Sequence, residues 1–156
     1  MRPADVDPFD AYVERGYVRR READPAVARG LYHRAQGKFR NMERLGIREG
    51  TATDYLENVY EAVKMLVQAF MALDGYSPYS HEAIIAYAID HLDVDGGTAN
   101  RFDKYRKLRN DVAYRGDVAT EHEAEAVREL FRGLREELGP DLEEHLIDEV
   151  AERCEE

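Results

Sequence analysis

Apolar residues recur every three or four positions along nearly all of this chain, and no segment alternates apolar and polar residues as a half-buried strand would. The clearest case is residues 54–73. Five side chains there fall on one helical face: Leu56, Val59, Val63, Leu66 and Phe70. Four polar side chains form a stripe on another face: Glu57, Glu61, Lys64 and Gln68. This period favours helices throughout, and it predicts that residues 54–73 form the central core helix.

Prolines and glycines divide the rest of the chain into further amphipathic segments. Asp24 followed by Pro25 is typical of a helix start, and this helix is expected to end at Gly46. Thr53 or Asp54 can cap the central helix, and Thr120 can start the fifth. Gly116 is suited to end a helix, because glycine readily takes the left-handed conformation. The other helices are expected at about residues 10–20, 80–92, 98–114, 120–138 and 140–153, with a break at Gly139-Pro140.

These segments predict an all-α fold, an up-and-down bundle of four to five helices with extra helices at the N- and C-terminal ends. The 156 residues fit one domain. It comprises an N-terminal extension (1–23), a core (about 24–138) and a C-terminal helix (140–153). No apolar run approaches the roughly 18 to 20 residues that cross a bilayer, and residues 1–10 lack the pattern of a signal peptide. We therefore expect a soluble, cytoplasmic protein with no membrane contact.

The net charge of -11 argues against a generic nucleic-acid binder. The acid is concentrated, however, since residues 117–156 hold 15 of the 33 acidic side chains. Basic residues cluster elsewhere: Arg19, Arg20 and Arg21; Arg40, Arg44 and Arg48; Lys104, Arg106, Lys107 and Arg115. These clusters are either a positive surface that binds RNA or nucleotide phosphate, or solvated helix faces with local ion pairs.

The common catalytic and metal-binding motifs are absent from the sequence. His81-Glu82 resembles the start of a zinc-binding HExxH motif, but position 85 is isoleucine and Ser80 makes a helix start the better interpretation. The stretch HLDVDGG contains Asp93 and Asp95 but lacks the later ligands of a calcium loop. Cys154 has no second thiol to pair with. We therefore predict no metal and no cofactor.

The stretch LRNDVAYRGDVATEHEAEAV, residues 108–127, resembles the end of the HEPN domain, a small all-helical family. It has an arginine followed by asparagine, then a tyrosine, a glycine and an acidic amphipathic segment. Upstream, DYLENVYEAVKMLVQAFMALDGYSPYSHEAIIAY, residues 54–87, is similar to the first core helix of that family, its hairpin and the start of its next helix. The resemblance covers about residues 54–135.

The resemblance implies a specific chemistry. Many HEPN proteins are metal-independent ribonucleases, with an arginine, a polar neighbour and a histidine four to six residues further on, and two copies of this motif face each other across a homodimer. Arg109 and Asn110 match, but Tyr114 stands in the position of the histidine. Tyrosine, with an ordinary pKa of about 10, is protonated at pH 7. It can therefore donate a hydrogen bond to phosphate, whereas action as a base would require a large fall in its pKa.

Helix geometry limits how these residues can meet. Five positions apart on a helix, Arg109 and Tyr114 point about 140° away from each other. Within one subunit they would converge only with local unwinding near Gly116, and a second subunit is the more natural source of convergence. Arg109 also borders the apolar face, where an unpaired charge is costly, and Glu57 or Glu61 could pair with it. In the structural alternative, Arg109 is a buried, paired arginine, Asn110 is a polar bridge and Tyr114 is a packing or capping residue.

The first functional hypothesis is a dimeric HEPN protein of a toxin-antitoxin or defence pair, acting on RNA as an endoribonuclease or binding RNA or nucleotide. Its catalytic residues would be Arg109, Asn110 and Tyr114. Phosphate contacts are expected from Arg106, Lys107 and Arg115, and support from Glu57, Glu61 and His81. The family also implies a minimal nucleotidyltransferase partner that can add AMP to a tyrosine, for which Tyr114 is the nearest candidate. The alternatives are a non-catalytic binding or oligomerisation module, and an accessory subunit that presents nucleotide to a partner enzyme.

Overall fold

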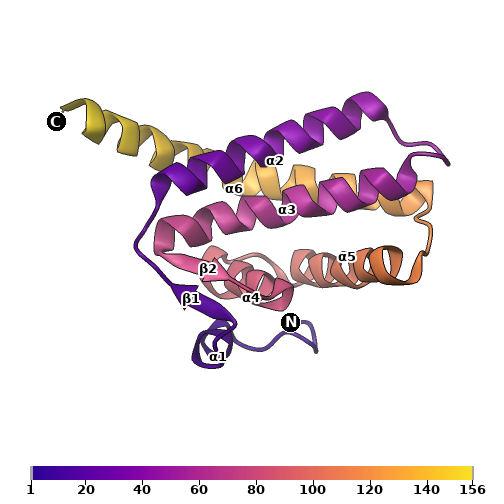
Figure 1. Cartoon of the computed structure of the whole chain (residues 1–156), viewed down its shortest axis with the longest axis horizontal. Coiled ribbons are helices and arrows are strands. Elements are labelled where there is room, and N and C mark those ends of the chain that lie inside the picture. The colour runs from indigo at the N-terminus through magenta and orange to yellow at the C-terminus, as the bar shows by residue number, and fades with distance from the viewer. Residues whose placement is uncertain (1, 156) are drawn as a thin grey trace.

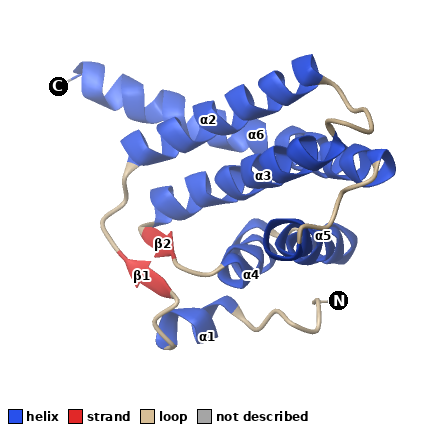
Figure 2. Ribbon diagram, turned by 45° about the vertical axis from the view of Figure 1, so that its right-hand side comes forward, coloured by secondary structure: helices blue, strands red, loops and turns tan. Residues whose placement is uncertain are grey.

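The predicted all-α bundle is confirmed (Figure 1). The computed structural model describes the backbone of residues 2–155 and the side chains of residues 2–146. The elements are α1 (Phe9–Glu14), β1 (Val18–Arg20), α2 (Pro25–Leu45), α3 (Ala52–Asp74), β2 (Tyr76–Pro78), α4 (His81–Leu92), α5 (Gly96–Arg115) and α6 (Glu121–Glu155). The helices α2, α3 and α6 lie along one another, and α4 and α5 follow end to end on the other side of α3 (Figures 1 and 2).

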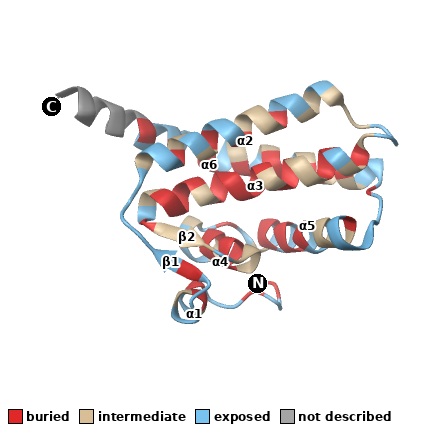
Figure 3. Ribbon diagram, viewed as in Figure 1, coloured by how far each residue is buried: buried red, intermediate tan, exposed pale blue. Residues whose placement is uncertain are grey.

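The central helix is α3, as the sequence predicted. Its buried side chains lie on almost every side of the helix rather than along one stripe. Figure 3 shows α3 buried along most of its length. Tyr55, Leu56 and Val59 are fully inaccessible to solvent, and so are Tyr60 and Val63. A helix that is apolar on all sides must be covered by its neighbours. The packing of α2, α4, α5 and α6 around α3 meets this requirement.

Most helix ends follow the expected local chemistry. The Asp24 carboxylate accepts a hydrogen bond from the Val27 N–H at 3.1 Å, with Pro25 in the first turn. Thr120 and Glu123 form a reciprocal capping box, in which each side chain accepts from the backbone N–H of the other. Gly116 ends α5 in the left-handed conformation, at φ 73°. These short-range signals are readable in sequence because each involves residues at most a few positions apart.

Two helix starts differ from the prediction. α3 begins at Ala52, so neither Thr53 nor Asp54 is its N-cap. The Thr53 hydroxyl instead accepts from the Ala119 N–H at 3.1 Å, in the segment that leads into α6. α5 begins at Gly96, two residues earlier than expected, because the Asp95 carboxylate accepts from the Thr98 N–H at 2.7 Å. The acidic loop before α5 thus has a helix-capping aspartate rather than a calcium ligand.

The expected helix over residues 10–20 is wrong in its second half. α1 ends at Glu14, Gly16 turns the chain at φ 82°, and residues 18–20 pair antiparallel with β2. Figure 2 shows this two-stranded sheet beside the end of α3. The pairing joins segments far apart in the chain, and each strand has three residues. A run that short carries no readable alternation, so the local pattern could not reveal it.

The expected break at Gly139-Pro140 is also wrong, because α6 runs through both residues. Leu138, Leu142 and Leu146 are buried at helical spacing. The Tyr32 hydroxyl of α2 donates to the Glu143 carboxylate at 2.5 Å. Pro140 is exposed, so its missing N–H and its ring lie on the side of the helix away from the core. Packing on both sides of the proline therefore outweighs its local preference.

Gly75 offers the first test of this fold. A Cβ at Gly75 would lie 2.4 Å from the Arg21 carbonyl oxygen, whereas a Cβ at Gly16, which also has φ +82°, would meet nothing within 4 Å. Both Gly→Ala variants carry the strain of the left-handed conformation, about 1 kcal/mol. Only Gly75→Ala adds a backbone overlap, so we expect it to lose a further 1–3 kcal/mol of unfolding free energy, about the cost of overpacking. Equal losses for the two variants in urea denaturation would contradict the close approach of β1 to the end of α3.

Pro140 offers the second test. Because α6 continues through it, Pro140→Ala restores a backbone N–H and removes the ring, and we expect the unfolding free energy to rise by about 1–3 kcal/mol. Glu137→Ala, an exposed position one turn earlier, is the matched control and should change stability by less than about 0.5 kcal/mol. A loss of stability in Pro140→Ala would show that the chain needs the proline to end a helix there.

Candidate functional site

Arg109 lies on α5 where this helix faces α3 and α2. Its side chain is half-buried, and its Nε is enclosed without a hydrogen-bond partner. The expected ion pair with Glu57 or Glu61 does not form. Among the side chains that the structure describes, no carboxylate lies within ion-pair distance of Arg109, and Glu61 binds Lys64 instead, at 2.8 Å. Arg109 therefore keeps an N–H directed into the protein that no neighbour accepts.

Arg109 borders a polar hollow of about 390 Å³ between α2, α3 and α5. The hollow is lined by Arg34, Lys38, Glu57, Asn58, Glu61, Met65 and Arg109. Arg34 and Lys38 are four residues apart on α2, so both reach the same face of that helix. Arg29 and Arg128 also have an enclosed nitrogen without a partner. What distinguishes Arg109 is therefore the hollow, where three cationic side chains meet two carboxylates.

Lys64 lies next to this hollow and departs from the prediction. It was expected on a polar stripe, yet it is only 7% exposed. Its Nζ lies 2.8 Å from the Glu61 carboxylate and 3.2 Å from Nε2 of His81, the first residue of α4. An ammonium group has no acceptor, so Nε2 must accept this hydrogen bond and Nδ1 must carry the imidazole proton. The arrangement fixes His81 in its neutral form and in one tautomer.

Electrostatics agree with the neutral form of His81. Burial lowers the pKa of His81, and the charges of Lys64 and Arg109 lower it further. The same region contains the Tyr60 hydroxyl, which is fully buried and has no hydrogen-bond partner. Burial raises the pKa of Tyr60, while the nearby charges of Arg106 and Arg109 act in the opposite direction. The charge of Arg109 thus acts on both His81 and Tyr60, although the three residues come from three helices.

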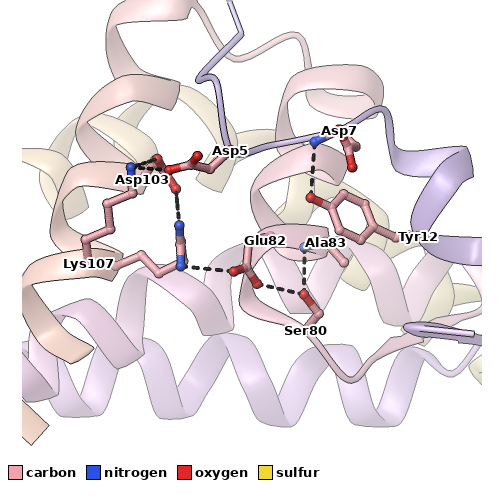
Figure 4. A network of polar contacts seen from close by, with 9 residues as sticks. Asp5, Asp7, Tyr12, Ser80, Glu82, Ala83, Asp103 and Lys107 are labelled. Atoms are coloured by element: carbon pink, nitrogen blue, oxygen red, sulfur yellow. Dashed lines mark hydrogen bonds and ion pairs between the residues drawn. The ribbon is translucent and has the colours of Figure 1, made fainter. Parts of the chain in front are cut away.

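Arg106 and Lys107, expected to contact phosphate, are already paired with carboxylates. Arg106 is 7% exposed, and its Nη1 lies 3.0 Å from Glu82 and its Nη2 2.8 Å from Asp103. Lys107 lies 2.5 Å from Asp5 and 3.2 Å from Asp103, and Figure 4 shows this network joining α5 to α4 and to the N-terminal segment. A buried arginine with two carboxylate partners is placed to stabilise the fold. This position favours a structural role for Arg106.

The remaining motif residues lie along the last turns of α5. Asn110 is half-buried, Tyr114 is 81% exposed, and Arg115 is exposed with Asp111 3.8 Å away. α5 is helical through Arg115, so Arg109 and Tyr114 point about 140° apart, as calculated for a straight helix. One subunit therefore brings Arg109 together with Lys38, Glu61 and His81, but not with Tyr114.

Several site residues could not be selected from sequence. Arg34, Lys38, Asn58 and Lys64 join the site only through the packing of α2 against α3 and of α4 against α3. The one sequence signal was the spacing of Arg34 and Lys38, four apart on a helix. No cluster of metal-binding side chains occurs among the residues that the structure describes. None of the helices within those residues is both long enough and apolar enough to cross a membrane.

Comparison of the chain with protein-family models, with curated proteins and with solved structures finds no match. The resemblance to the HEPN domain therefore remains a prediction from the motif residues and their order. The site has to be judged on its own geometry, which is a half-buried arginine beside a polar hollow and a neutral histidine.

His81 gives the third prediction, on stability and pH. The unfolded chain has a histidine pKa of about 6.5, and the pKa of His81 in the folded protein is lower. Below about pH 6.5 the unfolded state therefore binds the proton more readily, and the unfolding free energy falls as the pH falls. When the pH is lowered from 7 to 5, we expect the unfolding free energy of His81→Gln to fall by less than that of the wild type. His122→Gln, at an exposed histidine, is the control, and an equal pH dependence in all three proteins would contradict the lowered pKa of His81.

Proposed function

We propose that this chain is a HEPN-type domain that targets RNA or nucleotide phosphate through Arg109, Asn110 and Tyr114, as a member of a toxin-antitoxin or defence pair. The helical bundle and the place of the motif at the end of α5 support this proposal. A negatively charged ligand such as phosphate is suited to a site where arginine supplies fixed positive charge and planar N–H donors.

The observation that carries the proposal is the unpartnered Nε of Arg109 beside the hollow. A buried donor without a partner costs about 1–3 kcal/mol. A phosphate in the hollow would pair with the positive charge of the Arg109 guanidinium and would also attract Arg34 and Lys38. Glu57 and Glu61 oppose an anion there, but the Glu61 charge is offset by Lys64. The site is thus best matched to a phosphate that enters from the side of Arg34, Lys38 and Arg109.

The proposal includes a homodimer. Tyr114 and Arg109 diverge on α5, so a composite site would use Arg109 of one subunit and Tyr114 of the other, with α5 near the two-fold axis. A minimal nucleotidyltransferase is the proposed partner. The 81% exposure of Tyr114 would leave its hydroxyl accessible to the transfer of AMP.

A non-catalytic binding or oligomerisation module is the second candidate. The observation that favours it is the surroundings of Tyr114, which is exposed and has no hydrogen-bond partner among the described side chains. Tyr114 is therefore better placed to donate a hydrogen bond to a phosphate than to act as a base.

The fourth prediction tests Arg109 with a labelled single-stranded RNA in EDTA, measuring both binding and cleavage. Loss of a charge-assisted hydrogen bond costs about 1.5–3 kcal/mol, so we expect Arg109→Ala to weaken binding about tenfold or more. Arg44→Ala removes the same charge from an exposed position on α2 and should leave binding within about twofold. Cleavage that Arg109→Ala and Tyr114→Phe both abolish would support a ribonuclease.

The same experiment separates the two candidates. The non-catalytic module would be favoured if the wild type binds the RNA, Arg109→Ala does not bind it, and neither protein cleaves it. Equal binding by the wild type and Arg109→Ala would overturn the proposed site. A strictly monomeric mass in light scattering at micromolar concentration would rule out the composite site while leaving Arg109 as a binding residue.

A further inference from the structure

A second surface of the molecule combines unpaired arginines with exposed tyrosines. It lies on the β1/β2 sheet, at the opposite end of the molecule from the C-terminal turn of α5 (Figures 1 and 2). Tyr17 is 50% exposed and Tyr79 is 62% exposed, whereas most of the other aromatic side chains are buried. This contrast needs an explanation, because exposed tyrosines contribute little to the core.

The pairing of the strands places these side chains on one face. The register matches Val18 with Pro78 and Arg19 with Ser77. It extends at both ends, because the Tyr79 N–H donates to the Tyr17 carbonyl at 2.8 Å and the Arg21 N–H donates to the Gly75 carbonyl at 2.7 Å. Successive side chains of a strand alternate between faces, and Val18, 4% exposed, faces the core. The opposite face presents Tyr17, Arg19, Arg21 and Tyr79, which we call the arginine-tyrosine face.

The charges on this face are not neutralised. Among the described side chains, no carboxylate lies within ion-pair distance of Arg19, Arg20 or Arg21, although the chain has a net charge of -11. The guanidinium groups of Arg19 and Arg21 lie beside the Tyr79 hydroxyl and lower the pKa of that group. Arg20 belongs to the other face, where its guanidinium lies 6.0 Å from the centre of the Tyr76 ring.

We propose that the arginine-tyrosine face binds single-stranded nucleic acid, with bases stacked on Tyr17 and Tyr79 and backbone phosphates bound by Arg19 and Arg21. Aromatic rings stack on any unpaired base, and arginines bind the phosphates between the bases. The two arginines are two residues apart on an extended strand, so their side chains leave the backbone about 6.6 Å apart on the same side. A duplex, whose bases are already stacked, would lose the contribution of the tyrosines.

An acidic protein segment is the competing occupant, since the chain itself has an acidic α6. Such a segment would neutralise the arginines but would leave the two tyrosine rings exposed. Nucleic acid matches both halves of the face, so the structure favours it. The inference rests on the proposed function for the class of ligand, but it uses residues that the Arg109 site does not contain.

The fifth prediction measures binding of a fluorescein-labelled 2′-O-methyl RNA of about 12 nucleotides by anisotropy, because this strand cannot be cleaved through its 2′-OH. We expect the double variant Arg19→Ala/Arg21→Ala to weaken binding about tenfold or more at physiological salt. It should also lower the salt slope by about 1.4, the value for two phosphate contacts on a single strand. Tyr79→Leu should weaken binding about fivefold or more, while Tyr79→Phe, which keeps the ring, should bind like the wild type.

Matched controls make the outcome decisive. Arg40→Ala/Arg44→Ala removes the same charge from exposed positions on α2 and should bind within about twofold of the wild type. Circular dichroism checks that every variant is folded. An equal loss in the two double variants would overturn the proposal, because binding would then follow net charge alone. Unchanged binding by Tyr79→Leu or by Arg19→Ala/Arg21→Ala would overturn it as well.

The variants also separate this face from the Arg109 site. A loss of binding in Arg109→Ala but not in the arginine-tyrosine variants would leave the proposed function intact and remove the present inference. The reverse result would support the arginine-tyrosine face and count against Arg109. A dimer in light scattering that Arg19→Ala/Arg21→Ala dissociates, with RNA binding unchanged, would identify a second copy as the occupant and overturn the proposal.

Discussion

The burial of α3 on all sides is the constraint on which the rest of the structure depends. A helix of this kind cannot rest on one neighbour, so α2, α4, α5 and α6 must all pack against it. Several polar groups on α3 are then brought close to other helices. Lys64 and Glu61 pair with each other, and Lys64 also reaches His81 on α4. Tyr60 is enclosed without a partner. The polar groups around Arg109 are therefore a consequence of how completely α3 is covered.

The ion pairs of Arg106 set the position of α5 relative to α4. Arg106 bonds to Asp103 within α5 and to Glu82 at the start of α4, and Ser80 Oγ holds the Glu82 carboxylate at 2.9 Å (Figure 4). Removal of one member of a buried pair is strongly destabilising, because it leaves an uncompensated charge. Arg109 follows Arg106 by three residues on the same helix, so this network also positions the backbone of Arg109. Two arginines of one helix thus have different surroundings, since Arg106 is paired and Arg109 is not.

The two candidate surfaces differ in construction. The Arg109 site is a hollow between helices, in which a half-buried cation has fixed neighbours, and it is suited to holding one phosphate in a defined position. The arginine-tyrosine face lies on a two-stranded sheet with exposed tyrosines, and it is suited to tolerant stacking of bases along a single strand. The two surfaces share no lining residue, so substitutions in one should leave the geometry of the other unchanged.

The sequence by itself determined the helical class, the central place of residues 54–73 and the helix ends at Asp24, Thr120 and Gly116. Each of these depends on periodicity or on contacts within a few residues. It also singled out Arg109 and named Glu57 and Glu61 as possible partners; both line the same hollow, but no ion pair with Arg109 forms among the described side chains.

Only the tertiary structure decided the continuity of α6 through Pro140, the β1/β2 pairing, the burial of Lys64 and the ion pairs of Arg106. These features join residues that are distant in the chain or depend on packing that outweighs a local preference. A local pattern records which residues a helix can bury, but it does not record which neighbour will cover them. The packing of the helices determines which neighbour covers each apolar face. It thereby also forms the hollow beside Arg109 and leaves one face of the sheet exposed.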